Sequence, residues 1–175
     1  MIKTRRGLIA AIVTLAGLVL AGVTFFVARQ PSSTLNDELA AQVTLILEQA
    51  SPGEHHAHGH SGFESGVVCA VEPFGTEPPN ATSLVEVRWV YARHMCAITG
   101  ESPDWAASVR ASGPIAVKID IPPEVRVPKA GAGYPDRVRQ LIPERYHALA
   151  FEEFSDDSAI EAARERFALA SSTAK

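Results

Sequence analysis

The chain has 175 residues, which is long enough for an anchoring segment and one compact domain. Four of its 16 basic residues precede position 30 and all 20 acidic residues follow it, so residues 30–175 carry a formal charge of −8. Because this acidic part contains no cluster of basic residues, we exclude nucleic-acid binding. Arg outnumbers Lys by twelve to four, a bias that favours a GC-rich bacterial source.

Residues 7–28 are predicted to form a single transmembrane helix. The basic tip over residues 1–6, with Lys3, Arg5 and Arg6, precedes this uncharged apolar run. As a helix the run spans roughly 30 Å, the thickness of the hydrocarbon core of a bilayer. A cleavable signal peptide has a shorter apolar region, so we expect an uncleaved anchor. The basic tip places the N-terminus in the cytoplasm, which predicts a single-pass protein of the bacterial cell membrane with an extracytoplasmic domain.

Small side chains line one face of this predicted span. They recur at spacings of three and four residues: Ala10, Thr14, Gly17, Ala21 and Thr24. Such a stripe lets two helix backbones approach closely and so indicates a homodimer through the transmembrane helix. The alternative is that small residues simply fill the span of an alanine-rich protein.

Residues 29–61 are predicted to contain a membrane-proximal helix and a His-rich linker. The apolar residues with helical spacing are Leu39, Val43, Ile46, Leu47 and Ala50, and Pro52 and Gly53 end the helical pattern. The linker holds four of the six histidines of the chain: His55, His56, His58 and His60.

The four linker histidines permit three interpretations. Neutral imidazoles are good ligands for Zn²⁺, Cu²⁺ and Ni²⁺, which makes the linker a candidate metal site. Histidine titrates near pH 6.5, so protonation of the linker could instead sense acid outside the cell. The third interpretation is a flexible, solvated connection, because the segment has no companion motif that would fix a coordination geometry.

Two strands are predicted next, with one cysteine in each. The run "GVVCAV" is short and β-branched, "EPFGTEPPNATS" has the composition of a long turn, and "LVEVRWVYARHMCAIT" alternates as a strand from Val85 onward. Cys69 and Cys96 are the two cysteines of the chain, and such a pair outside the cytoplasm predicts a disulfide.

The alternative is a copper site in His94-Met95-Cys96. We disfavour it because alternate residues of a strand face opposite sides.

The rest of the domain is predicted to combine strands and helices. "ESPDWAASVRASG" suits either a short helix or a strand, "PIAVKIDIPP" alternates as a strand, and "EVRVP" suits a short edge strand. Pro135 can begin a helix that Pro143 ends, and Ser155 or Ser158 can cap a last helix. The apolar face of the "PIAVKIDIPP" strand would comprise Ile115, Val117, Ile119 and Ile121.

Together these elements predict one extracytoplasmic α+β domain over residues 62–170, in which helices pack on an antiparallel sheet, and a frayed tail over residues 171–175. In the order of its elements the domain is similar to cystatin-like and nuclear-transport-factor-like folds, which pack helices on a curved antiparallel sheet. This resemblance implies a fold and carries no motif, so it implies no functional residue.

Catalysis is not predicted. The run "GHSGF" around Ser61 lacks the final glycine of the G-x-S-x-G nucleophile elbow. His147 near Glu152 and Glu153 is more typical of a packing segment than of acid–base chemistry. We therefore expect a non-catalytic module that binds another envelope protein. The alternative function is extracytoplasmic binding of Zn²⁺, Cu²⁺ or Ni²⁺ by the histidines of the linker.

Overall fold

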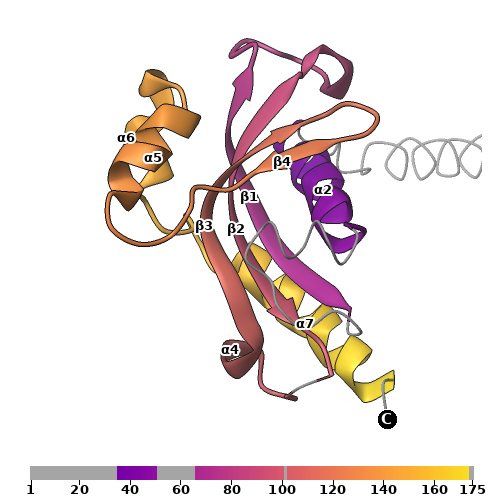
Figure 1. Cartoon of the computed structure of the whole chain (residues 1–175). Coiled ribbons are helices and arrows are strands. Elements are labelled where there is room, and N and C mark those ends of the chain that lie inside the picture. Colours follow the sequence, from indigo (N-terminus) through magenta and orange to yellow (C-terminus); the bar gives the residue numbers. More distant parts are fainter. Residues whose placement is uncertain (1–34, 51–65, 101, 174–175) are drawn as a thin grey trace, which may run out of the picture. The chain divides into compact units, whose positions relative to one another are not determined.

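A four-stranded antiparallel sheet is the central element of the computed structural model, which describes residues 35–50, 66–100 and 102–173 (Figure 1). The strands lie in the sheet in the same order as in the chain, so each strand pairs with its neighbour in sequence. They are β1 (Val67–Glu77), β2 (Trp89–Ile98), β3 (Val109–Lys118) and β4 (Glu124–Arg126). Helices pack on this sheet, which confirms the predicted α+β class for the described residues.

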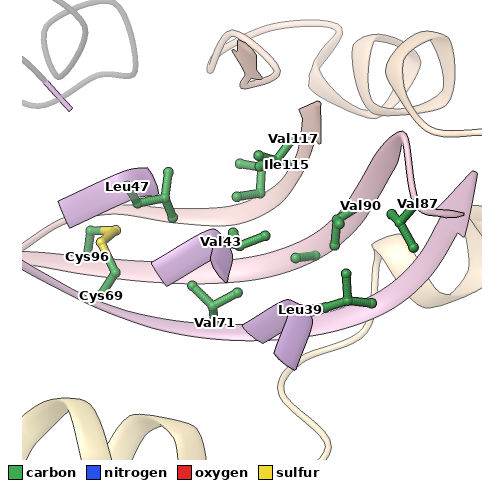
Figure 2. Close-up of a cluster of buried hydrophobic side chains, with 11 residues drawn as sticks. Leu39, Val43, Leu47, Cys69, Val71, Val87, Val90, Cys96, Ile115 and Val117 are labelled. Atoms are coloured by element: carbon green, nitrogen blue, oxygen red, sulfur yellow. A yellow bond between two sulfur atoms is a disulfide. The ribbon is translucent and has the colours of Figure 1, made fainter. Parts of the chain in front are cut away.

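Helix α2 (Leu35–Glu48) covers one face of the sheet, and its apolar stripe explains why. Leu39, Val43 and Leu47 recur every four residues along one side of the helix and are buried. Figure 2 shows Leu39 toward Val87 at one end of the sheet and Leu47 toward the paired cysteines near the other.

Helix α2 therefore belongs to the same folded unit as the sheet. The sequence pattern predicts this helix together with the His-rich linker in residues 29–61 and the start of the domain at residue 62. The structure places the helix in the core because its apolar stripe needs a surface to pack on, and the sheet supplies that surface.

The opposite face of the sheet is covered by two groups of helices. At the end where β1 begins, α4 (Trp105–Ser108) and α7 (Ser158–Thr173) pack on the sheet. At the other end lie α5 (Tyr134–Leu141), the 3-10 helix η2 (Glu144–Tyr146) and α6 (His147–Ala150). Because both faces of the sheet are covered, nearly every residue of β2 is buried. The strand therefore shows little of the alternation between buried and exposed residues that is expected when one face is open to solvent.

Strand β1 is longer than predicted. It continues from Val71 through Glu77, across residues that the sequence analysis assigned to a turn. The amide of Cys69 points away from β2 and donates to Glu48 of α2. Because the direction of the backbone amide alternates along a strand, the nitrogen of Pro73, four residues later, lies on the same outer side. A proline there costs no hydrogen bond between the strands. A bulge then follows between Pro73 and Gly75. A Cβ atom on Gly75 would lie 2.6 Å from the Tyr146 ring, so this glycine is needed for the close packing of η2 on the strand.

Strand β2 begins later than predicted. The residues before it form the 3-10 helix η1 (Leu84–Glu86), on which Val85 is 93% exposed instead of lying on a strand face. The side chain of Glu86 accepts hydrogen bonds from the amide and the hydroxyl of Thr82, which stabilise a local turn. The same two hydrogen bonds, the amide first, lower the pKa of Glu86.

Two further element ends differ from the sequence analysis. Strand β3 stops at Lys118, so Ile115 and Val117 are buried as predicted whereas Ile121 is fully exposed on the turn before β4. Helix α7 continues to Thr173, across part of the predicted frayed tail. The short helix and the strand that were alternatives for "ESPDWAASVRASG" are both present, as α4 and the start of β3.

Candidate functional site

A cleft lies on the face of the sheet that α4, α5, α6 and α7 share, between the segment after α6 and the start of α7. Its volume is about 420 Å³. Residues 93–95 of β2 and 112–114 of β3 line it from the sheet, and residues 152–154, 157 and 160 line it from the segment after α6 and from α7. The cleft is therefore bounded by residues from three separate parts of the chain.

The cleft has an apolar part and an acidic rim. Its apolar lining comes from Met95, Phe154 and Ile160, which are partly buried, and from Pro114. Its exposed carboxylates are Glu152, Glu153 and Asp157. Such a surface suits a ligand that combines an apolar stem with a positive charge.

Arg93 fixes the shape of the cleft. Its side chain is 7% exposed and pairs with Glu72, the residue directly opposite on β1. Its Nε donates to the carbonyl oxygen of Glu152 at 3.0 Å, and its Nη2 donates to that of Leu149 at 3.0 Å. Because these bonds occupy the guanidinium, Arg93 acts as a support for the segment after α6.

Glu72 completes this support from the neighbouring strand. One of its carboxylate oxygens accepts hydrogen bonds from the backbone amide of Ser155 at 2.8 Å and from the Ser155 hydroxyl at 3.1 Å. The Arg93 guanidinium also lies over the Phe74 ring, 5.3 Å from its centroid. Arg93 and Glu72 together therefore hold residues 149–155 against the sheet.

The electrostatic character of the rim extends into α7. Residues 152–165 contain six carboxylates and one basic residue, Arg164. Within this run, hydrogen bonds from the Ser158 hydroxyl and then its backbone amide lower the pKa of Asp156, so that this carboxylate keeps its charge in mild acid. The mouth of the cleft is negative at neutral pH and favours cationic groups.

His147 does not join Glu152 and Glu153 in the cleft. Its Nε2 lies 2.8 Å from the carbonyl oxygen of Ile142 and 3.1 Å from that of Arg139. Since a carbonyl oxygen accepts, this nitrogen carries the proton and ties α6 to the end of α5.

The predicted disulfide is present. Cys69 and Cys96 lie opposite each other in the register of β1 and β2, and their sulfur atoms are 2.03 Å apart. The sulfur of Cys96 is thus bonded, and His94 is buried with Nδ1 2.8 Å from the carbonyl oxygen of Gly113. These contacts argue against the copper alternative for residues 94–96.

The outer edge of β1 is closed next to this disulfide. Glu48 of α2 accepts a hydrogen bond from the Cys69 amide at 2.9 Å, and Arg166 of α7 donates one to the Cys69 carbonyl oxygen at 2.7 Å. Glu48 and Arg166 also pair with each other at 3.0 Å. Because these side chains occupy the edge groups that another strand would use, we do not place a binding site there.

Several predicted functional residues lie outside the described ranges. These are His55, His56, His58 and His60 of the candidate metal site, Ser61, and the predicted span over residues 7–28 with its stripe of small side chains. Within the described ranges, no three His, Cys, Asp or Glu side chains are arranged to hold a metal ion. In the same ranges, no helix is both long and apolar enough to span a bilayer.

Comparison of the chain with protein-family models, with curated proteins and with solved structures gives no match. From the sequence, Glu152 and Glu153 stood out only as neighbours of His147, and Arg93 was not predicted as part of a site. The acidic run from Glu152 to Glu165 was the signal in the sequence that could have located the rim.

Proposed function

We propose that the chain is a membrane-anchored extracytoplasmic protein whose domain binds another envelope protein through the cleft, without catalysis. The observation that carries this proposal is the cleft itself, whose volume of about 420 Å³ lies within the range of ligand-binding pockets. Its shape is fixed in advance, because Arg93 and Glu72 hold the segment after α6 in place. A fixed site loses less conformational entropy on binding.

The chemistry of the cleft suits a lysine or arginine side chain of the partner. Its aliphatic stem would lie along Met95, Phe154 and Ile160, and its charged head would reach the carboxylates of the rim. The surplus of acidic residues in the domain would also steer a basic partner toward this mouth.

Site-specific photo-crosslinking in native membranes tests this proposal. A photoreactive phenylalanine analogue replaces Glu153 at the rim in one strain and Asp136, an exposed acid on α5 outside the cleft, in another. We expect a discrete cross-linked protein from position 153 that position 136 does not give. The same products from both positions, or none from position 153, would contradict the proposal.

A matched pair of charge variants tests the role of the rim. The variant E152Q/E153Q/D157N removes three charges from the cleft, whereas E124Q/D136N/E144Q removes three exposed charges that neither line it nor belong to the acidic run of residues 152–165. We expect the cross-link from a photoreactive group at Met95, inside the cleft, to fall several-fold in the first variant only. An equal loss in both would assign the effect to net charge instead of the cleft.

The disulfide supports the extracytoplasmic placement, since such bonds persist in oxidising compartments. Protease added to intact spheroplasts, whose inner membrane is sealed, tests the predicted topology. We expect the domain to be digested while a cytoplasmic marker survives. Protection of the domain until the cells are lysed would contradict the topology.

A further inference from the structure

Two exposed apolar side chains mark one end of the sheet. Among the large apolar residues of the described ranges, Val85 and Ile121 are the most exposed, at 93% and 102%. Val85 lies on η1, between β1 and β2, and Ile121 lies on the turn between β3 and β4. The sequence pattern predicted both residues on strands, and Ile121 on the buried face of its strand.

The register of the strands shows that these two turns lie at the same end of the sheet. Glu77, the last residue of β1, pairs with Trp89, which pairs with Lys118, which pairs with Glu124. These four residues form one row across the sheet, and both turns extend beyond this row (Figure 1). Val85 and Ile121 therefore lie beyond the same end of the sheet, although they are far apart in sequence.

Helix α2 begins at this same end. Leu35, its first residue, packs against the same cluster of apolar side chains as Leu84 of η1, and α2 contacts η1 directly. Farther along the helix, Leu47 lies near the disulfide, so α2 runs away from the two turns (Figure 2).

The length of the connecting chain limits how far this end can lie from the membrane. The predicted span ends at residue 28 and α2 begins at Leu35. The six intervening residues reach at most about 20 Å when fully extended, because each adds no more than about 3.6 Å. The end of the domain that carries Val85 and Ile121 is thus tethered close to the bilayer surface.

Ion pairs neutralise part of the charge at this end. Glu77, Asp120 and Glu124 each pair with a basic side chain, and these are Arg145, Lys118 and Arg126 respectively. Glu86 of η1 and the first-turn acids Asp37 and Glu38 of α2 lie at the same end, so a contact with lipid here rests on the apolar side chains and not on charge.

We propose that Val85 and Ile121 insert into the boundary between headgroups and acyl chains on the extracytoplasmic side of the membrane that holds the anchor. The partner of this surface is lipid, and the contact rests on the anchor of the proposed function. Exposed apolar side chains on turns gain contact with lipid at this boundary without unfolding of the domain. The contact would orient the domain and leave the cleft open at its side.

The test uses the full chain in liposomes of phosphatidylethanolamine and phosphatidylglycerol, with an environment-sensitive NBD fluorophore at single positions. The described residues contain no free cysteine, so cysteines introduced as V85C, I121C and L169C can be labelled selectively. Leu169 is the matched control because it is 70% exposed, apolar, and lies near the C-terminal end of α7, away from both turns (Figure 1). Flotation of the liposomes shows in the same samples whether the chain is anchored.

We expect probes at positions 85 and 121 to emit at shorter wavelength and to resist quenching by iodide, and the probe at position 169 to be quenched freely. If the chain floats but positions 85 and 121 are quenched as readily as position 169, the lipid contact is overturned and the anchor stands. Protection of only one of the two positions overturns the two-turn contact. If the chain does not float, the anchor is disproved and the lipid contact falls with it.

Discussion

Arg93 is the side chain on which the shape of the cleft most depends. The variant R93M removes the positive charge but keeps an apolar stem, and it leaves the Glu72 carboxylate and the carbonyl oxygens of Leu149 and Glu152 without their donor. Loss of one partner of a buried ion pair costs about 3 to 5 kcal/mol, so we expect the free energy of unfolding to fall by that amount. Urea unfolding followed by tryptophan fluorescence measures it, because Trp89 and Trp105, the two tryptophans of the chain, both lie in the domain.

Arg139 supplies the control for this prediction. It pairs with Asp136 three residues earlier on α5, and its side chain is 52% exposed. The variant R139M should change the free energy of unfolding by less than about 1 kcal/mol, as exposed ion pairs do. If both arginine variants lost the same stability, the structural role assigned to Arg93 would be wrong.

The sequence could predict Cys69 and Cys96 but not Arg93, and the reason is physical. A disulfide needs two cysteines and an oxidising compartment, both of which the sequence indicates. A buried arginine needs acceptors that the fold brings to it, and here two of them lie 56 and 59 residues away in the chain. Periodicity within a strand contains no information about such distant partners.

Among the secondary-structure elements, helix α2 offers two substitutions that test where the domain begins. Leu39 is fully buried against the sheet, whereas Leu45 of the same helix is 47% exposed. We expect L39A to lower the free energy of unfolding by about 2 to 5 kcal/mol, as for other large-to-small substitutions in a core. The matched variant L45A should cost less than about 1 kcal/mol. Equal, small effects in urea unfolding would show that α2 does not belong to the core.

The disulfide connects β1 to β2 and closes a loop across 27 positions of sequence. In the chain-entropy model a loop of this size contributes about 3 to 4 kcal/mol, so we expect the double variant C69A/C96A to unfold at a correspondingly lower urea concentration. Addition of a reducing agent should destabilise the native chain in the same way and leave the double variant unchanged. Destabilisation of the double variant by the reagent would assign the effect to something other than this bond.

The elements that the sequence predicted well are those whose pattern is local. Of the stripe predicted for α2, Leu39, Val43 and Leu47 are buried. Of the strand face predicted in "PIAVKIDIPP", Ile115 and Val117 are buried, whereas Ile121 is exposed. Proline and glycine led to the wrong prediction of a turn in β1. In the structure Pro73 lies on the outer edge of the strand and Gly75 makes room for the Tyr146 ring. Whether a proline ends a strand depends on which strand lies beside it, and that is a property of the sheet.

At the scale of the whole chain, metal binding by the His-rich linker can be tested separately from partner binding by the domain. We expect the full chain to bind Zn²⁺, Cu²⁺ and Ni²⁺ with roughly micromolar or weaker affinity, because His-rich tracts without a fixed geometry bind metal weakly. The variant H55A/H56A/H58A/H60A should lose this binding and keep the cross-link from position 153. Calorimetric titration measures the affinity, and stoichiometric submicromolar binding that this variant lacks would make metal binding the leading function.

The packing of α7 on β1 has a consequence for how the domain is made. The chain is synthesised from its N-terminus, and because strand order follows chain order, β1, β2 and β3 can pair one after another before α7 is complete. Phe167 of α7, however, belongs to the same buried cluster as Val68 and Ala70 of the first strand. The surface that α7 covers on this strand thus stays bare until the last helix has been synthesised, so a chain that stalls or is cut short before α7 would expose these apolar side chains to chaperones and proteases.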